Sequence, residues 1–198
     1  MESKRHSASD DPVLDAALSC VLAVGVRRTT FTDVARKAGL SRMTLYRRWP
    51  DVRALVADLI TREWTAVAVG ASPAPDDPRP VREQLVEGLV GGLRTLRSHP
   101  LLRKILEVDP EMLLPYLFDR RGASQDVLLE LLEEGLARGH QDGSVRPDHP
   151  RRQARSLLLV IQSYALSLQT MTEDDDPELT DTTYEDELRH ILDRTLTP

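Results

Sequence analysis

The side chains with the most evident chemistry in this sequence lie close together near its N-terminal end. They are Arg42, Met43, Thr44, Tyr46, Arg47 and Arg48. Arginine can hydrogen-bond guanine O6 and N7, threonine or methionine can contact a thymine methyl group, and hydroxyl groups can bond phosphates. These residue types, placed on one side of a helix, indicate a surface that binds the major groove of DNA.

Two short helices are needed to present these side chains, and the sequence contains residues that would begin and end them. Thr30 and Ser41 can each accept a hydrogen bond from an unpaired backbone N–H group at the start of a helix. Gly39, between them, suits the end of the first helix because glycine tolerates a left-handed backbone. The pattern therefore predicts a helix, a tight turn and a second helix.

The second of these helices is expected to have one buried and one exposed side. Leu45 and Trp49 are one turn apart, so both should face the protein core. At 100° per residue, Met43 and Arg47 then point away from the core and should approach base edges. The other residues expected to contact DNA lie nearer the rims, where side chains can reach phosphates: Thr30, Thr32, Arg42, Thr44, Tyr46 and Arg48.

The helix-turn-helix of the TetR family of transcriptional regulators resembles residues 29–55 of this chain, TTFTDVARKAGLSRMTLYRRWPDVRAL. A threonine-rich start, an Ala-Gly turn, a serine cap and a Thr-Leu-Tyr-x-x-aromatic core are all present. Three positions depart from the usual pattern, since Met43 replaces a small residue, Trp49 a phenylalanine and Val52 a lysine that contacts phosphate. Whether Arg53 supplies the missing contact is left open by the sequence.

The distribution of charge also favours DNA binding by this part of the chain over the alternative of two merely solvated helices. Residues 25–53 contain eight Arg and Lys against two Asp, in a chain whose net charge is −6. Residues 1–70 carry eleven Arg and Lys against eight Asp and Glu, and the remainder carries fifteen against twenty-four. A basic N-terminal part on an acidic remainder indicates that only the former meets nucleic acid.

A proline-rich stretch, residues 70–80, marks a boundary between two parts of the chain. Strand patterns are absent, so we expect an all-α fold. The N-terminal part, residues 10–69, is predicted to be a three-helix helix-turn-helix DNA-binding domain. Residues 79–198 are predicted to form a larger helical domain for ligand binding and dimerisation.

Two long helices are expected in the second domain, over residues 124–138 and 150–171. The middle of the second, Leu157–Ile161, is apolar on nearly every side and so requires more than one packing partner. We therefore expect a homodimer whose interface is built from these two helices of each subunit. The side chains predicted to form that interface are Leu128, Leu132, Leu158, Ile161, Ala165 and Leu168.

The resemblance implies a repressor that a small-molecule effector releases from a double-stranded DNA operator. A helix over residues 81–96 is interrupted by Gly88, Gly91 and Gly92, and these glycines either permit close helix contact or leave space for a ligand. The Leu-rich composition is compatible with an apolar ligand. The candidate ligand-binding residues, each of which has a structural or surface role as its alternative, are Gly92, His99, Tyr116, Gln162 and Tyr164.

Other kinds of chemistry find little support in the sequence. No two of the five histidines are three or four residues apart, and Cys20 is the only cysteine, so we expect no metal site, no cofactor and no intrachain disulfide. No nucleotide-binding or nucleophile motif is present, and we expect no catalytic residues. A structural, nucleoid-type DNA-binding protein is the main alternative to a regulator, and a small helical enzyme is a more remote one.

The N-terminal residues 1–10 are polar. Lys4 and Arg5 could contact a phosphate backbone or minor groove, with a plain disordered terminus as the stronger alternative. No apolar run of 18 residues and no signal-peptide pattern occurs in the sequence. We therefore expect a cytoplasmic protein that does not enter a membrane.

Overall fold

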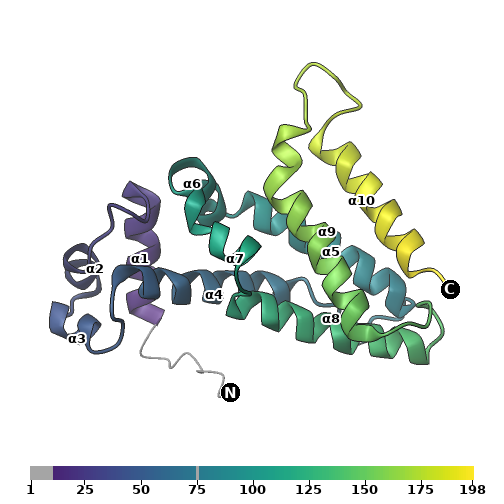
Figure 1. The fold of residues 1–198 in the computed structure, drawn as a ribbon, viewed down its shortest axis with the longest axis horizontal. Coiled ribbons are helices and arrows are strands. Elements are labelled where there is room, and N and C mark those ends of the chain that lie inside the picture. The colour runs from purple at the N-terminus through teal and green to yellow at the C-terminus, as the bar shows by residue number, and fades with distance from the viewer. Residues whose placement is uncertain (1–10, 75) are drawn as a thin grey trace. The chain divides into compact units, whose positions relative to one another are not determined.

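A computed structural model describes residues 11–74 and 76–198, and the regular elements in that part of the chain are all helices (Figure 1). The expectation of an all-α fold is confirmed, whereas Lys4 and Arg5 lie outside the described residues. The α-helices are α1 (Asp11–Val24), α2 (Phe31–Ala38), α3 (Arg42–Tyr46), α4 (Val52–Gly70), α5 (Val81–Ser98), α6 (Pro100–Val108), α7 (Leu114–Phe118), α8 (Ala123–Gln141), α9 (Pro150–Ser167) and α10 (Asp181–Leu196). Short 3-10 turns occur at η1 (Pro110–Met112) and η2 (Leu168–Thr170).

Tertiary contacts divide the chain into two compact units. The first unit contains the described residues up to Trp64 together with Ser98–Gly122, and the second contains Thr65–Arg97 and Ala123–Pro198. Helix α4 therefore begins in the first unit and ends in the second. Helices α6 and α7 belong to the first unit although they follow the proline-rich stretch in the sequence, so this division is not the linear one expected from composition.

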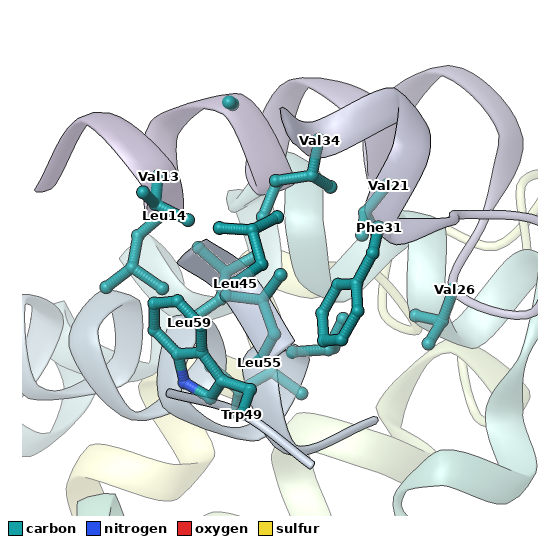
Figure 2. Close-up of a cluster of buried hydrophobic side chains, with 14 of the residues drawn as sticks. Val13, Leu14, Val21, Val26, Phe31, Val34, Leu45, Trp49, Leu55 and Leu59 are labelled. Carbon is teal, nitrogen blue, oxygen red and sulfur yellow. The ribbon is translucent and has the colours of Figure 1, made fainter. Parts of the chain in front are cut away.

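The core of the first unit joins the helix-turn-helix to its supporting helices α1, α4 and α6. Figure 2 shows Leu45 and Trp49 in this core, which confirms the side of α3 predicted to be buried. Helix α6 contributes Leu101 and Ile105, both fully buried. Burying large aliphatic side chains stabilises a fold by about 1.5–3 kcal/mol each, so α6 is an integral part of this unit.

A buried carboxylate, that of Asp109, fastens the end of α6 to the turn after α1. Asp109 is 1% exposed, and its two oxygens accept from the Val26 N–H at 2.6 Å and from Arg27 Nε at 2.7 Å. Burial by itself would raise the pKa of Asp109, but the hydrogen bonds from Arg27 and Val26 outweigh it, so the pKa lies below its usual value. Gly25 has φ 84° and a Cβ there would lie 2.7 Å from Asp109 Oδ2, so this close approach requires glycine.

The second unit has its own core, contributed by α5, α8, α9 and α10. Helices α8 and α9 pack along each other, and four arginine–carboxylate pairs join α5 to α10. These pairs are partly or largely exposed to solvent, and ion pairs of that kind contribute little each. They are Arg82–Asp193, Arg94–Glu185, Arg97–Asp181 and Arg189–Glu87.

The glycines of α5 are explained in part by close packing. A Cβ on Gly88 would lie 2.7 Å from the backbone oxygen of Ala71, and one on Gly92 would lie 3.1 Å from the Ala71 side chain. A Cβ on Gly91 would meet nothing within 4 Å. Close contact with the segment after α4 therefore accounts for Gly88 and Gly92, whereas Gly91 borders open space.

The side chains predicted for the dimer interface do not all face outward. Leu132, Leu158 and Ile161 are buried in the core of the second unit, and Leu168 is buried as well. The area that these four could add to a contact with another subunit is therefore small. Only Leu128 and Ala165 are half-buried at the margin of this core. Leu159, which was not among the predicted residues, is 69% exposed. In the apolar run Leu157–Ile161, most side chains therefore pack inside their own subunit, and Leu159 is the leucine that faces solvent.

Candidate nucleic-acid interface

The two helices of the motif begin at the caps that the sequence predicts, and α2 ends at the predicted glycine, but α3 ends at Tyr46 and so is shorter than the helix through Trp49 that was expected. Thr30 Oγ1 accepts from the Asp33 N–H at 3.2 Å, and Ser41 Oγ accepts from the Thr44 N–H at 3.2 Å. Gly39 ends α2 in the left-handed conformation with φ 68°. These caps satisfy N–H groups that a helix start leaves unpaired, and they set the tight turn between α2 and α3.

Helix α3 has only five residues and cannot be stable by itself, so tertiary contacts must hold it. Leu45 is fully buried, and the Tyr46 ring meets the Phe31 ring edge to face with centroids 4.9 Å apart. Beyond the helix, the Trp49 N–H still bonds the Leu45 carbonyl at 2.9 Å, and its indole Nε1 donates to Asp58 Oδ2 on α4 at 2.8 Å. The contacts on the buried side of α3 thus determine which of its side chains are left facing outward, toward DNA.

The opposite side of α3 is exposed and basic, as the helical spacing predicts. Met43 is 69% exposed and Tyr46 is 54% exposed, which is unusual for large side chains of this kind. Thr44 is half-buried, and its hydroxyl lies 3.0 Å from that of Ser41. The remaining predicted DNA contacts are all exposed: Thr30, Thr32, Arg42, Arg47 and Arg48.

The environment of two of these side chains affects how they could bind phosphate. The Thr30 hydroxyl donates to Asp33 Oδ2 at 2.6 Å, so it would have to rotate before donating to a phosphate. The guanidinium of Arg48 lies over the Trp49 ring, 5.2 Å from its centroid. Sequence reasoning missed Asp58 as the partner of Trp49, since no local pattern links residues nine apart.

The five residues predicted to bind a ligand are divided between the two units. His99 and Tyr116 belong to the first unit, whereas Gly92, Gln162 and Tyr164 belong to the second. His99 has structural contacts, because its Nδ1 accepts from the Leu101 N–H at 3.2 Å and its Nε2 lies 3.2 Å from Glu63 Oε2.

The remaining candidates are partly buried or stacked on a neighbour. The ring of Tyr116 lies beneath the guanidinium of Arg120, 5.3 Å away. Burial raises the pKa of Tyr164, which packs at the edge of the second core, and Glu187 and Tyr184 add to that shift. Gln162, which lies two residues before Tyr164 on α9, is half-buried.

The part of the chain that the structure describes offers neither a metal-binding cluster nor a membrane-spanning helix. Its His, Cys, Asp and Glu side chains form no group of three that could hold a metal ion. Within the same residues, no helix is both long enough and apolar enough to cross a membrane.

Comparison with known sequences gives a consistent result. The sequence profile of the bacterial regulatory proteins of the tetR family matches residues 13–59. The uncharacterized HTH-type transcriptional regulator Mb2274c of Mycobacterium bovis is 40% identical over 151 residues, which cover 76% of this chain and 77% of that protein. The similarity to this relative therefore extends well beyond the helix-turn-helix.

Comparison with solved structures shows the same fold at lower identity. The transcriptional repressor QsdR of Rhodococcus erythropolis, from the TetR family, has a TM-score of 0.69 at 14% identity, with 96% of each chain covered. SmeT, the repressor of the Stenotrophomonas maltophilia multidrug efflux pump SmeDEF, has a TM-score of 0.64 at 21% identity, covering 97% of this chain and 93% of SmeT. A complex of SmeT with triclosan gives a TM-score of 0.64 at 20% identity.

Proposed function

The chain belongs to the TetR family of transcriptional regulators, and we propose that it is a homodimeric repressor that a small molecule releases from its DNA operator. The observation that carries the DNA-binding part is the exposed surface of α3. Met43 and Tyr46 on α3 and Arg47 just after it face solvent, while Leu45 on α3 and Trp49 in the following turn are buried. A short, capped helix with its apolar side fixed presents these side chains in one orientation.

Within that surface we assign different contacts to different residues. Met43 and Arg47 lie opposite the buried side and approach base edges, where arginine can bond guanine and methionine can meet a thymine methyl group. Tyr46, Arg48 and Thr30 lie nearer the rims and bind phosphates, as Arg42 and Thr44 also can. Thr32 is exposed on α2, and we assign it a further contact with the phosphate backbone of the DNA.

Selection of bound sequences from random DNA, followed by salt titration of two arginine variants, tests this assignment. Arg47→Ala should weaken operator binding by about 1–3 kcal/mol, relax selection at one or two base pairs, and have little effect on random DNA. Arg48→Ala should weaken binding to all sequences alike and lower the salt slope by about one per subunit contact, because fewer counterions are released. No enriched sequence would indicate a structural DNA-binding protein instead.

For the dimer, we assign the interface to the outer sides of α8 and α9. Leu159 is exposed on α9, and Leu128 on α8 and Ala165 on α9 are half-buried in the same unit. An exposed leucine can lose more water-exposed area in a dimer than Leu158 or Ile161 could, because those two are already buried. Sedimentation equilibrium at micromolar concentration should show a dimer, and a folded monomer would contradict the assignment.

For the effector, we propose a small apolar molecule that binds the second unit near α5 and α9. Gly91 borders open space, and Gln162 and Tyr164 offer half-buried polar groups. SmeT, which shares the fold, has been solved with triclosan. The effector must prefer the conformation that cannot bind DNA, since equal affinity for both conformations shifts no population. A thermal-shift screen of apolar compounds, followed by operator-release assays, tests this proposal.

A further inference from the structure

Figure 2 shows the side chain of Trp49 in the core of the first unit. Its indole also makes two directional contacts. Its Nε1 donates to Asp58 Oδ2 at 2.8 Å, and the guanidinium carbon of Arg48 lies 5.2 Å from the ring centroid. One buried side chain therefore joins a carboxylate on α4 to a surface guanidinium next to α3. Filling the core would require only an aromatic ring, so these two contacts call for a separate explanation.

We propose that Asp58 is a positioning residue for DNA binding, which acts through Trp49 to hold Arg48 in the orientation that contacts phosphate. The inference rests on the proposed function, in which Arg48 is a phosphate contact. Asp58 itself does not touch DNA in this scheme. Its role is to fix the Trp49 ring, and the ring in turn supports the guanidinium.

The backbone around these residues explains why an anchor is needed. Helix α3 ends at Tyr46, and the N–H groups of Arg48 and Trp49 both bond the Leu45 carbonyl at 2.9 Å. The helical ladder stops there, because the next helix, α4, begins only at Val52, so a few hydrogen bonds are all that the ladder contributes to this segment. A phenylalanine could occupy the same space, but it has no N–H to lock the rotation of its ring. The bond to Asp58 removes that freedom.

Electrostatics act in the same direction as geometry. An N–H that donates to a carboxylate is polarised, which increases the electron density on the face of the indole ring. A cation above that face is then attracted more strongly. A guanidinium that stacks by its face keeps its N–H groups directed outward in their plane, and this arrangement would let Arg48 rest on Trp49 and donate to a phosphate at the same time.

The sign of the effect separates positioning from simple charge. The Asp58 carboxylate repels DNA phosphates, so on charge alone its removal should strengthen binding. Positioning of Arg48 predicts the opposite result. Asp51 supplies the matched control, because it is an exposed carboxylate at the start of α4 whose Oδ1 accepts from the Ala54 N–H at 2.8 Å. Asp51→Ser removes that charge and retains a capping oxygen.

The experiment measures the affinity of the full chain for its selected operator and for random DNA across a range of salt concentrations. Asp58→Ala and Trp49→Phe should each bind both DNAs about three- to tenfold more weakly, with a salt slope shifted toward that of Arg48→Ala. Asp58→Asn retains an acceptor oxygen but not the charge, and it should bind more tightly than Asp58→Ala does. Asp51→Ser should bind at least as tightly as the wild type. Circular dichroism shows whether each variant is folded. If Asp58→Ala does not fold, Trp49→Phe takes its place as the variant that breaks the hydrogen bond.

A double variant tests whether both residues act on the same contact. Adding Asp58→Ala to Arg48→Ala should cause little further loss, whereas full additivity of the two effects would overturn the proposal. Tighter binding by Asp58→Ala, equal to that of Asp51→Ser, would overturn it as well. A wild-type salt slope in Arg48→Ala would refute the phosphate role assigned under the proposed function, and the positioning role with it. A normal Arg48→Ala effect with no loss in Asp58→Ala would refute the positioning role alone.

Discussion

The two units of the chain are stabilised in different ways. In the first unit, short helices depend on buried or half-buried polar anchors, namely Asp109 at the turn after α1 and the Trp49–Asp58 hydrogen bond at the end of α3. In the second unit, long helices share a leucine-rich core, and the charged pairs between α5 and α10 lie at its surface. Both units have an apolar core, and in the first unit the polar anchors named above also fix the ends of short helices.

This difference suits the work proposed for each unit. DNA contacts require side chains held within a fraction of an ångström, and a hydrogen bond fixes direction in a way that apolar packing does not. A helical bundle that responds to a ligand must instead allow its helices to shift, which exposed ion pairs permit at small cost. Substitutions in the second unit should therefore change its stability mainly through the apolar volume that they bury or expose. Substitutions in the first unit should act mainly through the individual hydrogen bonds that they remove.

The largest effect is expected from a pair of adjacent leucines in α9. Leu158 is 6% exposed, so Leu158→Glu would bury a carboxylate without a partner and should destabilise the second unit by more than about 4 kcal/mol. Leu159 is 69% exposed, so Leu159→Glu should leave the subunit folded and weaken only dimerisation. Circular dichroism with sedimentation separates the two outcomes. Equal loss of structure in both variants would contradict the assignment of sides on α9.

A smaller but more localised effect is expected from Asp109→Asn. The substitution replaces a charged acceptor of the Val26 and Arg27 hydrogen bonds by a neutral one, and it should lower the stability of the first unit by about 2–3 kcal/mol. Trp49 and Trp64, the two tryptophans of the chain, both belong to that unit. Denaturant unfolding followed by tryptophan fluorescence should therefore report the loss. An unchanged midpoint would show that the polar anchor is dispensable.

The same carboxylate predicts how the first unit responds to acid. The pKa of Asp109 is lower in the folded chain than the usual value near 3.9, so the unfolded chain takes up the proton first as the pH falls. Its contribution to stability is complete above about pH 4 and is lost as the pH falls through the folded pKa. The wild type should lose fluorescence-monitored stability in that range more steeply than Asp109→Asn. Parallel curves would argue against the depressed pKa.

An acid-sensitive carboxylate of the second unit sharpens this comparison. The hydrogen bond from the His149 N–H, with those from Arg146 and Arg152, lowers the pKa of Asp148 to about 2. Asp148→Asn should therefore reduce the loss of helical signal between about pH 4 and pH 2 while leaving the tryptophan signal unchanged. A change in the fluorescence curve would show that the two units do not unfold separately.

The smallest effects are expected from glycines one turn apart in α5. Gly91→Ala adds a methyl group where nothing lies within 4 Å, and it should stabilise the second unit by up to about 1 kcal/mol through helix propensity. Gly88→Ala should destabilise it, because the new Cβ would lie 2.7 Å from the Ala71 backbone oxygen. Thermal unfolding of both variants checks this prediction. The same sign for both would mean that packing at Ala71 adjusts freely.

Local sequence signals were sufficient for much of the DNA-binding surface. The capping roles of Thr30 and Ser41, the left-handed Gly39 and the burial of Leu45 were all predictable, because each depends on residues within one or two helical turns. The two long helices were also predictable from their apolar periodicity. Their orientation was not, since an all-round apolar run such as Leu157–Ile161 does not reveal which side meets its own subunit.

The sequence by itself determined the all-α class, the order of the helices and the family, because these follow from short-range periodicity, caps and a local motif. Only the tertiary structure decided that α6 belongs to the first unit and that Asp109 fastens it there. It also decided that Leu159, and not Leu158, faces solvent. The physical reason is that these outcomes depend on contacts between residues far apart in the chain, such as Val26 and Asp109. No local pattern encodes which of many possible long-range partners a buried group will meet.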